Sequence, residues 1–289
     1  MLAGSPGPFS DDHILPFAQE VFSHFDLVTN REPVSKNVLC RYGFDISNVH
    51  DLACPAFIFE PAQQEEVIAY LENTPLKVKK KPVIGFVLCG WNMQEGPFNR
   101  VDWRADEFNH YVEVIRYMIQ KYDVKVCLMS HSNGFDLPPY FNLKKGRDYP
   151  IMKQLYDLLR HTEVATNVFL LNGVYSPAVT KGIISNYDML ISGRVHAAVA
   201  GLSQSVPTVI IDYGHEPKAH KLRGFAEVAE VAAYVADPAD LQDLKEKVDA
   251  CWNNRMLINS TLQNRNKIIR EMVHHNFDLL KEMYERKRF

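Results

Sequence analysis

The chain has 289 residues, of which 46% are hydrophobic and 23% are charged, and its formal net charge at pH 7 is -3. This composition predicts a globular fold with ample material for a core, either as two modest domains or as one large domain with extensions. It argues against a nucleic-acid binder with a strongly basic surface, and no window is apolar over the length needed to cross a bilayer. The amino-terminal segment has no charged region followed by an apolar run, so we expect a cytoplasmic protein.

Residues 1–77 are predicted to form part of a Rossmann-like α/β domain. The end of a strand at 1–3, a Gly- and Pro-rich turn at 4–9, a strand at 27–29 and a strand with a loop within 48–59 are expected. Three helices are predicted: one that begins after Asp11 or Asp12, one that carries Ser35 and ends near Gly43, and one over 61–73. The apolar face of the first helix would consist of Ile14, Phe17, Val21, Phe22 and Phe25. Because such a beginning leaves no room for the first βαβ units, we expect a shortened amino-terminal domain.

A lysine-rich run, Lys77-Val-Lys-Lys-Lys-Pro82, separates this domain from the next. Lysines that precede a proline and a buried strand are more typical of a solvated linker than of a nucleic-acid site. A second Rossmann-like domain with the donor site is then predicted over 78–260. A helix over 261–289 follows, and we expect it to pack back toward the amino-terminal domain.

Regular alternation of strands and helices begins after this linker. Strands are predicted at 82–88, 124–129, 167–171, 189–192, 208–212 and 234–236, and helices at 108–122, 149–160, 177–185, 226–232, 240–251 and 262–287. The continuous apolar runs of the first strands are typical of a central parallel sheet. Polar turns at 89–92 and 130–134 would therefore lie at the carboxyl edge of that sheet, where α/β proteins bind ligands.

The most informative stretch is Asp188-Met-Leu-Ile-Ser-Gly-Arg-Val-His-Ala-Ala-Val-Ala-Gly, which continues to Tyr213. It is predicted to form a buried strand, a tight turn, a helix and a second buried strand. Arg194 and His196 would lie in the first turn of that helix, where unpaired backbone N–H groups and the helix dipole favour an anion. The small residues after His196 would let the helix pack closely on the sheet.

This stretch, with its Ser-x-Arg-x-His element and the later Lys221-Leu-Arg-Gly-Phe225, resembles the signature of the polysaccharide pyruvyl transferase family. Residues 4–9, 26–35 and 172–177 agree with it, so the resemblance covers essentially the whole chain. It implies a GT-B-like α/β fold, in which two Rossmann-like parallel-sheet domains face a cleft, the amino-terminal one being shortened here. It also implies an enzyme that transfers a pyruvyl group from phosphoenolpyruvate to a sugar of a cell-surface polysaccharide or glycan precursor, releasing phosphate and often leaving a cyclic ketal.

The resemblance and the chemistry of phosphoenolpyruvate together assign roles to residues. This compact anion requires multidentate cationic donors and no nearby carboxylates, and Arg194 is the best candidate. Arg31 matches the family's Arg-x-x-x-Ser element and would supply a second cation across the cleft. Lys221 matches its Lys-x-x-Gly-Phe element, although Lys218 competes for that role. His196 would be the general acid that protonates the methylene carbon, because the bound anion favours an imidazolium.

No cofactor or metal is implied, since phosphoenolpyruvate is itself the donor substrate and the scattered cysteines and histidines form no metal-binding cluster. Trp91, Asn92, His131 and Asn133 follow predicted strands and are candidate contacts to the saccharide acceptor. Such acceptors are often lipid-linked, which is compatible with peripheral association at the inner membrane face. The acceptor sugar and the oligomeric state stay open.

Plainer interpretations remain for each residue. A histidine in the first turn of a helix is usually a packing or capping residue, and Arg31 or the lysines near 221 could be solvated surface charges. Two other functions also remain: a GT-B glycosyltransferase that uses a nucleotide sugar, and a non-catalytic, truncated family member.

Overall fold

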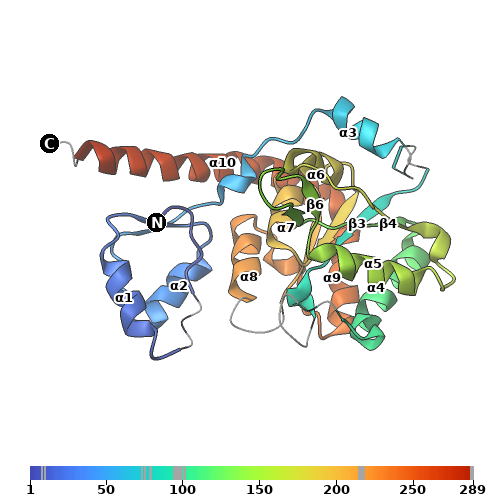
Figure 1. Ribbon diagram of the computed structural model, residues 1–289, viewed down its shortest axis with the longest axis horizontal. Coiled ribbons are helices and arrows are strands. Elements are labelled where there is room, and N and C mark those ends of the chain that lie inside the picture. The colour runs from blue at the N-terminus through green and yellow to red at the C-terminus, as the bar shows by residue number, and fades with distance from the viewer. Residues whose placement is uncertain are drawn as a thin grey trace.

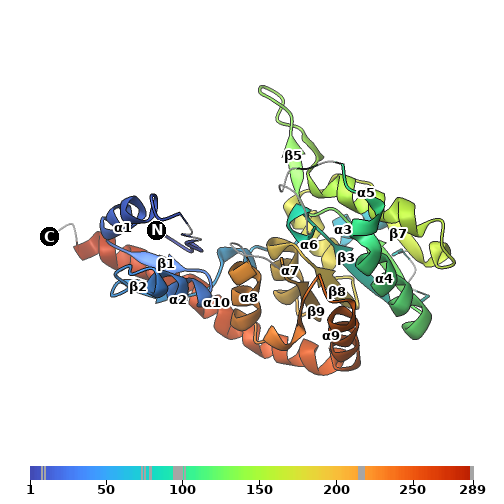
Figure 2. The same ribbon diagram turned by 90° about the horizontal axis from the view of Figure 1, so that it is seen from below.

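A computed structural model describes the chain except residues 8, 10, 73, 75, 78, 79, 94–99, 101, 214–218 and 287–289. A large α/β part and a smaller amino-terminal part lie side by side, and α10 runs along both (Figure 1; Figure 2). The helices are α1 (Leu15–Ser23), α2 (Val34–Arg41), α3 (Gln64–Leu71), α4 (Asn109–Tyr122), α5 (Asp148–Leu159), α6 (Pro177–Ile184), α7 (Val195–Leu202), α8 (Ala219–Val228), α9 (Leu241–Asn253) and α10 (Arg255–Arg286). The strands are β1 (Val28–Asn30), β2 (Val49–Asp51), β3 (Val83–Val87), β4 (Lys125–Leu128), β5 (Asn133–Phe135), β6 (Leu143–Lys145), β7 (Val168–Leu170), β8 (Met189–Ser192), β9 (Thr208–Ile211) and β10 (Val235–Ala236).

The large part is built on a 6-stranded sheet of order β10-β9-β8-β3-β4-β7. Every neighbouring pair in it is parallel. The chain moves outward from β3 through β4 to β7, and then returns to place β8 on the other side of β3. This reversal lies between β3 and β8, so a ligand crevice is expected at the carboxyl ends of these two strands.

Helices cover both faces of this sheet, which explains why its strands are apolar without alternation. Ile84 and Phe86 of β3 belong to the core shared with α4, α5 and α9. Val83 and Val87, which point the other way, pack with α3, α6 and α7. Since side chains of a strand alternate between faces, the continuous apolar run of β3 fills both cores.

The amino-terminal part has its own small core. The strands β1 and β2 pair in parallel, and Val28 and Val49 from them pack with Leu39 of α2 and with Phe44. The first residues run beside β1, since the Arg31 N–H donates to the Gly4 carbonyl at 2.9 Å.

One prediction for this part needs correction, because the apolar face expected for the first helix is largely exposed. No residue of α1 is buried, and Phe17 is 66% exposed. Of the predicted face, Phe22 packs on Phe44, with 5.1 Å between the ring centroids.

The last helix belongs to both parts. It begins at Arg255, earlier than predicted, and its first half contributes Ile258 and Leu262 to the large core. Further along, the buried Asn276 accepts a hydrogen bond from the Thr29 hydroxyl at 2.6 Å and donates one to the Ala53 carbonyl at 3.2 Å. Helix α10 is therefore long enough to contact both the large core and the amino-terminal part. Over the described ranges, no helix is long and apolar enough to cross a membrane.

Two further elements differ from the prediction. Helix α8 begins at Ala219 and ends at Val228, whereas a helix was predicted over 226–232. The segment after β4 forms an antiparallel hairpin of β5 and β6, where only a polar turn was predicted.

Candidate functional site

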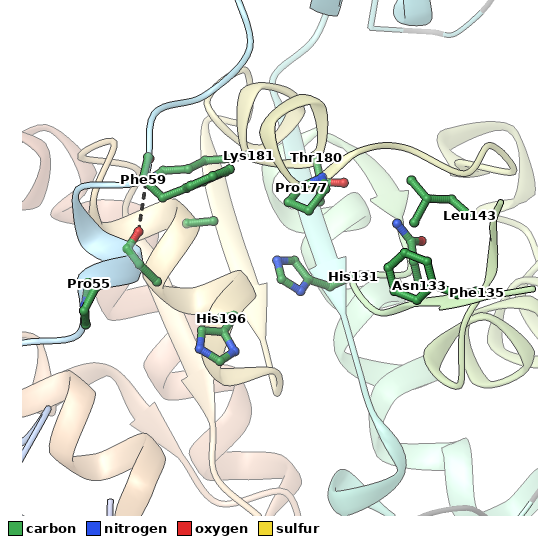
Figure 3. Close-up of a pocket in the computed structure, with 12 residues that line it drawn as sticks. Pro55, Phe59, His131, Asn133, Phe135, Leu143, Pro177, Thr180, Lys181 and His196 are labelled. Carbon is green, nitrogen blue, oxygen red and sulfur yellow. Dashed lines mark hydrogen bonds between the residues drawn. The ribbon is translucent and has the colours of Figure 1, made fainter. Parts of the chain in front are cut away.

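A cavity of about 550 Å³ lies beside the carboxyl edge of the sheet, between the segment that follows β2 and the helices α6 and α7 (Figure 3). The imidazoles of His131 and His196 reach it from the end of β4 and from the first turn of α7 (Figure 3). It is lined by Pro55, Ala56, Phe59, His131, Asn133, Phe135, Leu143, Pro177, Thr180, Lys181, His196 and Ala200.

Hydrogen bonds of a serine and the close packing of two glycines fix the turn between β8 and α7. The Ser192 hydroxyl accepts a hydrogen bond from the Arg194 N–H at 3.1 Å and donates to the Arg194 carbonyl at 3.0 Å. Gly193 packs on the Asn92 amide, so that a Cβ there would lie 2.1 Å from Asn92 Oδ1. Gly201 lies equally close to the sheet, where a Cβ would be 2.8 Å from Leu190 Cδ2. These close contacts fix the start of α7, and with it Arg194 and His196.

Arg194 has a buried acidic partner, contrary to the expected absence of nearby carboxylates. Its Nε lies 3.3 Å from Oδ2 of Asp148, whose side chain is wholly buried at the start of α5. The Ser132 N–H also donates to this carboxylate, at 3.0 Å. Burial raises the pKa of Asp148, while Arg194 acts to lower it. The ion pair therefore orients the guanidinium beside the turn that carries His131.

His196 lies among positive charges from both parts of the molecule. Burial, Arg31 and Arg194 all lower its pKa, in that order of importance. The pKa of His131 is lowered as well, by burial first and then by His196 and Arg194. Both imidazoles are therefore favoured in the neutral form while the site holds no anion.

Arg31 reaches this site from the loop between β1 and α2. Its Nε donates to the Ser5 hydroxyl at 2.7 Å, and its guanidinium lies over the Phe225 ring, 5.3 Å from the centroid. Phe225 is part of α8, and Lys221 lies one turn before it on the same face of that helix. The other candidate lysine, Lys218, lies outside the described residues.

The two motifs that carried the resemblance contact each other. Glu32 is buried and accepts hydrogen bonds from the N–H of Ser35, at 3.0 Å, and from the Ser35 hydroxyl. A Cβ at Gly224 would lie 2.2 Å from Glu32 Oε2, so the glycine lets α8 approach this carboxyl. The Arg-x-x-x-Ser and Lys-x-x-Gly-Phe elements thus form one interface between the two parts. Sequence reasoning missed Glu32, and a glycine inside a helix was the available signal.

The four acceptor candidates separate into two pairs. His131 and Asn133 line the cavity, and the Asn133 amide donates to the Tyr175 carbonyl at 2.6 Å. Trp91 instead packs against Tyr213, with 6.2 Å between the ring centroids.

The prediction for Asn92 is corrected by its burial, since only 2% of it is exposed. Its Oδ1 accepts from the Cys89 N–H at 2.9 Å and its Nδ2 donates to the Ile211 carbonyl at 3.4 Å. The amide thus joins the end of β3 to the end of β9, across β8, and its hydrogen-bonding groups are used within the protein.

Sequence reasoning also missed Lys181 of α6. Its buried Nζ donates to the carbonyls of Phe59, at 2.5 Å, and Ala56, at 3.2 Å, and thereby holds the segment after β2 against the cavity (Figure 3). Burial lowers the pKa of Lys181 to about 8. A lysine within an otherwise apolar helix was the signal for this role. Among the residues with described positions, no group of three or more His, Cys, Asp or Glu side chains could hold a metal ion.

A parallel sheet of this order beside a smaller α/β part is the arrangement of a GT-B fold. The family model of polysaccharide pyruvyl transferases matches residues 1–215, and the chain therefore belongs to this enzyme family. The match includes Arg31, Arg194 and His196, whereas Lys221 lies beyond it. No curated protein matches the sequence significantly.

Solved structures share the fold at low sequence identity. The Anabaena Alr3699/HepE complex with UDP and glucose is 14% identical with a TM-score of 0.61, over 98% of this chain and 70% of that one. A UDP-forming trehalose-phosphate synthase from Burkholderia xenovorans is 10% identical with a TM-score of 0.58, over 96% of this chain and 66% of that one. These likenesses establish the GT-B fold, as the sequence resemblance implied.

Proposed function

We propose that this protein transfers a pyruvyl group from phosphoenolpyruvate to a saccharide acceptor of a cell-surface polysaccharide or its precursor. The observation that carries this proposal is that His196 lines the cavity, while Arg31 from the amino-terminal part and Arg194 from the large part lie close enough to lower its pKa. Two guanidiniums around one imidazole suit a donor that carries both a phosphate and a carboxylate. Lys221 on α8 is the third cation of this donor site.

The lowered pKa of His196 would couple donor binding to protonation. The negative charges of phosphoenolpyruvate offset those of Arg31 and Arg194, so that binding raises the pKa of His196 and the imidazole takes up a proton. The imidazolium then donates this proton to the methylene carbon of the donor, and an oxocarbenium-like centre forms at the neighbouring carbon. A sugar hydroxyl attacks this centre and loses its proton. A second hydroxyl then displaces the phosphate, which leaves with the proton of that hydroxyl, and the ketal closes.

His131 is suited to accept a hydrogen bond from the attacking hydroxyl, whose proton returns to His196, since that imidazole is neutral after its donation. It lines the same cavity as His196, and its pKa is held well below the usual range by burial, by His196 and by Arg194. In this mechanism the protonated His196 is the proton donor, and the neutral His131 is the hydrogen-bond acceptor.

Phosphate release tests the mechanism. Wild-type protein is incubated with phosphoenolpyruvate and a panel of sugars, beside His196→Gln and the exposed control His275→Gln on α10. We expect His196→Gln to lower the rate about 100-fold or more, the usual contribution of a general acid, and the control to leave it unchanged. Equal rates for wild type and His196→Gln would show that the mechanism is wrong.

Thermal stability separates this function from transfer of a nucleotide sugar. We expect phosphoenolpyruvate to raise the melting temperature, and UDP-glucose to leave it unchanged. The reverse result would identify a nucleotide-sugar glycosyltransferase, and a shift with neither ligand would favour a non-catalytic family member.

A further inference from the structure

We propose that the β5–β6 hairpin, residues 133–145, anchors the protein on an anionic phospholipid surface by placing its tip among the lipid headgroups. The hairpin projects from the large part, away from the sheet and from α10 (Figure 2). Its outer end holds Leu137, Tyr140 and Phe141, which are 83%, 76% and 60% exposed. Large apolar side chains gathered on one projection mark a surface that binds a partner.

The charge of the hairpin favours an anionic partner. Lys144 and Lys145 lie on its returning strand and Arg147 follows, whereas Asp136 is the one acidic residue between Ser130 and Arg147. Asp136 lies 3.7 Å from Lys144, which is itself well exposed. Basic residues beside a membrane contribute about 1 kcal/mol each to binding of anionic lipids.

The composition and hydrogen bonding of the tip favour a lipid surface over a protein groove. Tyrosine beside leucine and phenylalanine is typical of the zone between headgroups and acyl chains, because the ring is apolar and the hydroxyl stays hydrated. The backbone of the hairpin is largely paired within itself: β5 and β6 form a ladder, and the Asp136 N–H donates to the Asn142 carbonyl at 2.9 Å. The tip itself, 137–141, would lie among hydrated headgroups, where water can satisfy its backbone groups.

The base of the same hairpin forms a wall of the cavity. Phe135 and Leu143 are cross-strand neighbours, and both line it (Figure 3). A tip held at a bilayer would therefore bring the cavity close to the lipid surface. If the proposed pyruvyl transfer is correct, which this step requires, the acceptor saccharide is presented from that surface.

Co-sedimentation with vesicles tests the anchor. The full chain is mixed with vesicles of phosphatidylcholine alone or with about one third phosphatidylglycerol, and the bound fraction is measured at low and high salt. The test variant is Leu137→Ser with Phe141→Asn. Asparagine suits position 141, because its φ of 47° lies in the left-handed region. The matched control is Met256→Ser with Leu257→Ser, which removes side chains that are similarly exposed on α10.

We expect wild type and control to bind the anionic vesicles, more weakly at high salt, and the hairpin variant to bind about tenfold more weakly. Wild type that stays in the supernatant with anionic vesicles, or a hairpin variant that binds like wild type, would overturn the proposal. Phosphate release with a water-soluble sugar is measured in parallel and should be equal in wild type and hairpin variant. Vesicle binding without phosphate release would contradict the proposed function and support the anchor. Phosphate release without vesicle binding would support the function and contradict the anchor.

Discussion

His196 lies near the positive charges of Arg31 and Arg194, and these charges affect its pKa. Burial, Arg31 and Arg194 all disfavour its protonated form. A histidine whose pKa is lowered by folding stabilises the protein fully above the unfolded value, and this stabilisation is lost as the pH falls from there through the folded pKa. The contribution of His196 to the free energy of unfolding is therefore smallest in mild acid. A bound anion should stabilise the protein most under those conditions, because it offsets the added positive charge.

Replacement of Arg31 by Gln should raise the pKa of His196, because one like charge is removed while the side chain keeps a similar size. The imidazole titration is measured by nuclear magnetic resonance, with Arg41→Gln as the control, since Arg41 is an exposed arginine of the same amino-terminal part. We also expect Arg31→Gln to lose less stability in mild acid than wild type. An unchanged pKa would show that Arg31 does not act on His196.

Prediction from sequence worked best for residues that lie in one compact stretch. Arg194 and His196 are close in sequence and start a helix after a buried strand, a pattern whose physical meaning is local. Asp148 and Lys181 act on the site from other elements, and no local pattern pairs them with it. Asn92 was misjudged because a polar residue after a strand can face either solvent or the neighbouring strand ends.

Among the elements, the contact of α8 with Glu32 joins the two parts most closely. Burial raises the pKa of Glu32, whereas its hydrogen bonds to Ser35 lower it. The glycine at 224 costs helix stability on its own, since glycine is a poor helix former. This glycine lets α8 approach α2 and so brings Phe225 to Arg31.

Gly224→Ala should separate these helices, because its Cβ would lie 2.8 Å from the Cβ of Glu32 as well as close to the carboxyl. We expect a loss of about 1–3 kcal/mol in the free energy of unfolding, measured by urea denaturation. In a Glu32→Ala background the same substitution should cost less, since the carboxyl atoms that it meets are removed and only the contact with the Cβ of residue 32 stays. Equal costs in both backgrounds would contradict the contact.

The strands of the large sheet were predicted to within one or two residues at their ends, because burial on both faces requires continuous apolar runs. The hairpin of β5 and β6 was missed, since its short strands are exposed and carry no alternation. The helix predicted over 226–232 starts too late and ends too late relative to α8, Ala219–Val228. The pattern alone did not extend a helix through Gly224, since glycine is a poor helix former. Contacts between elements far apart in the chain could not be predicted from sequence patterns.

At the scale of the whole molecule, the amino-terminal part depends on α10. The GT-B class came from the resemblance, while the strand order and this dependence came from the structure. Asn276 is nearly fully buried, and its amide bonds both Thr29 on β1 and the carbonyl of Ala53. Over the residues that the structure describes, Arg270 and Glu60 form another polar contact between α10 and the early part of the chain.

Asn276→Ala should destabilise the amino-terminal part by about 2 kcal/mol, because it leaves buried polar groups without partners. Hydrogen exchange is the measurement: amides of β1 and β2 should exchange faster, while those of β3 and β8 stay protected. The control is His275→Ala, an exposed neighbour on the same helix. Uniform acceleration over both parts, or none, would contradict this division.

The position of Asn276 has a consequence during translation. The ribosome completes β1 and β2 early, yet Asn276, which bonds Thr29 of β1 and the Ala53 carbonyl after β2, is added more than two hundred residues later. Domains generally fold as they emerge, at about 5–20 residues per second. The small parallel sheet must therefore wait roughly ten seconds or longer with its helical support still unmade, and during that interval it is the segment most in need of a chaperone.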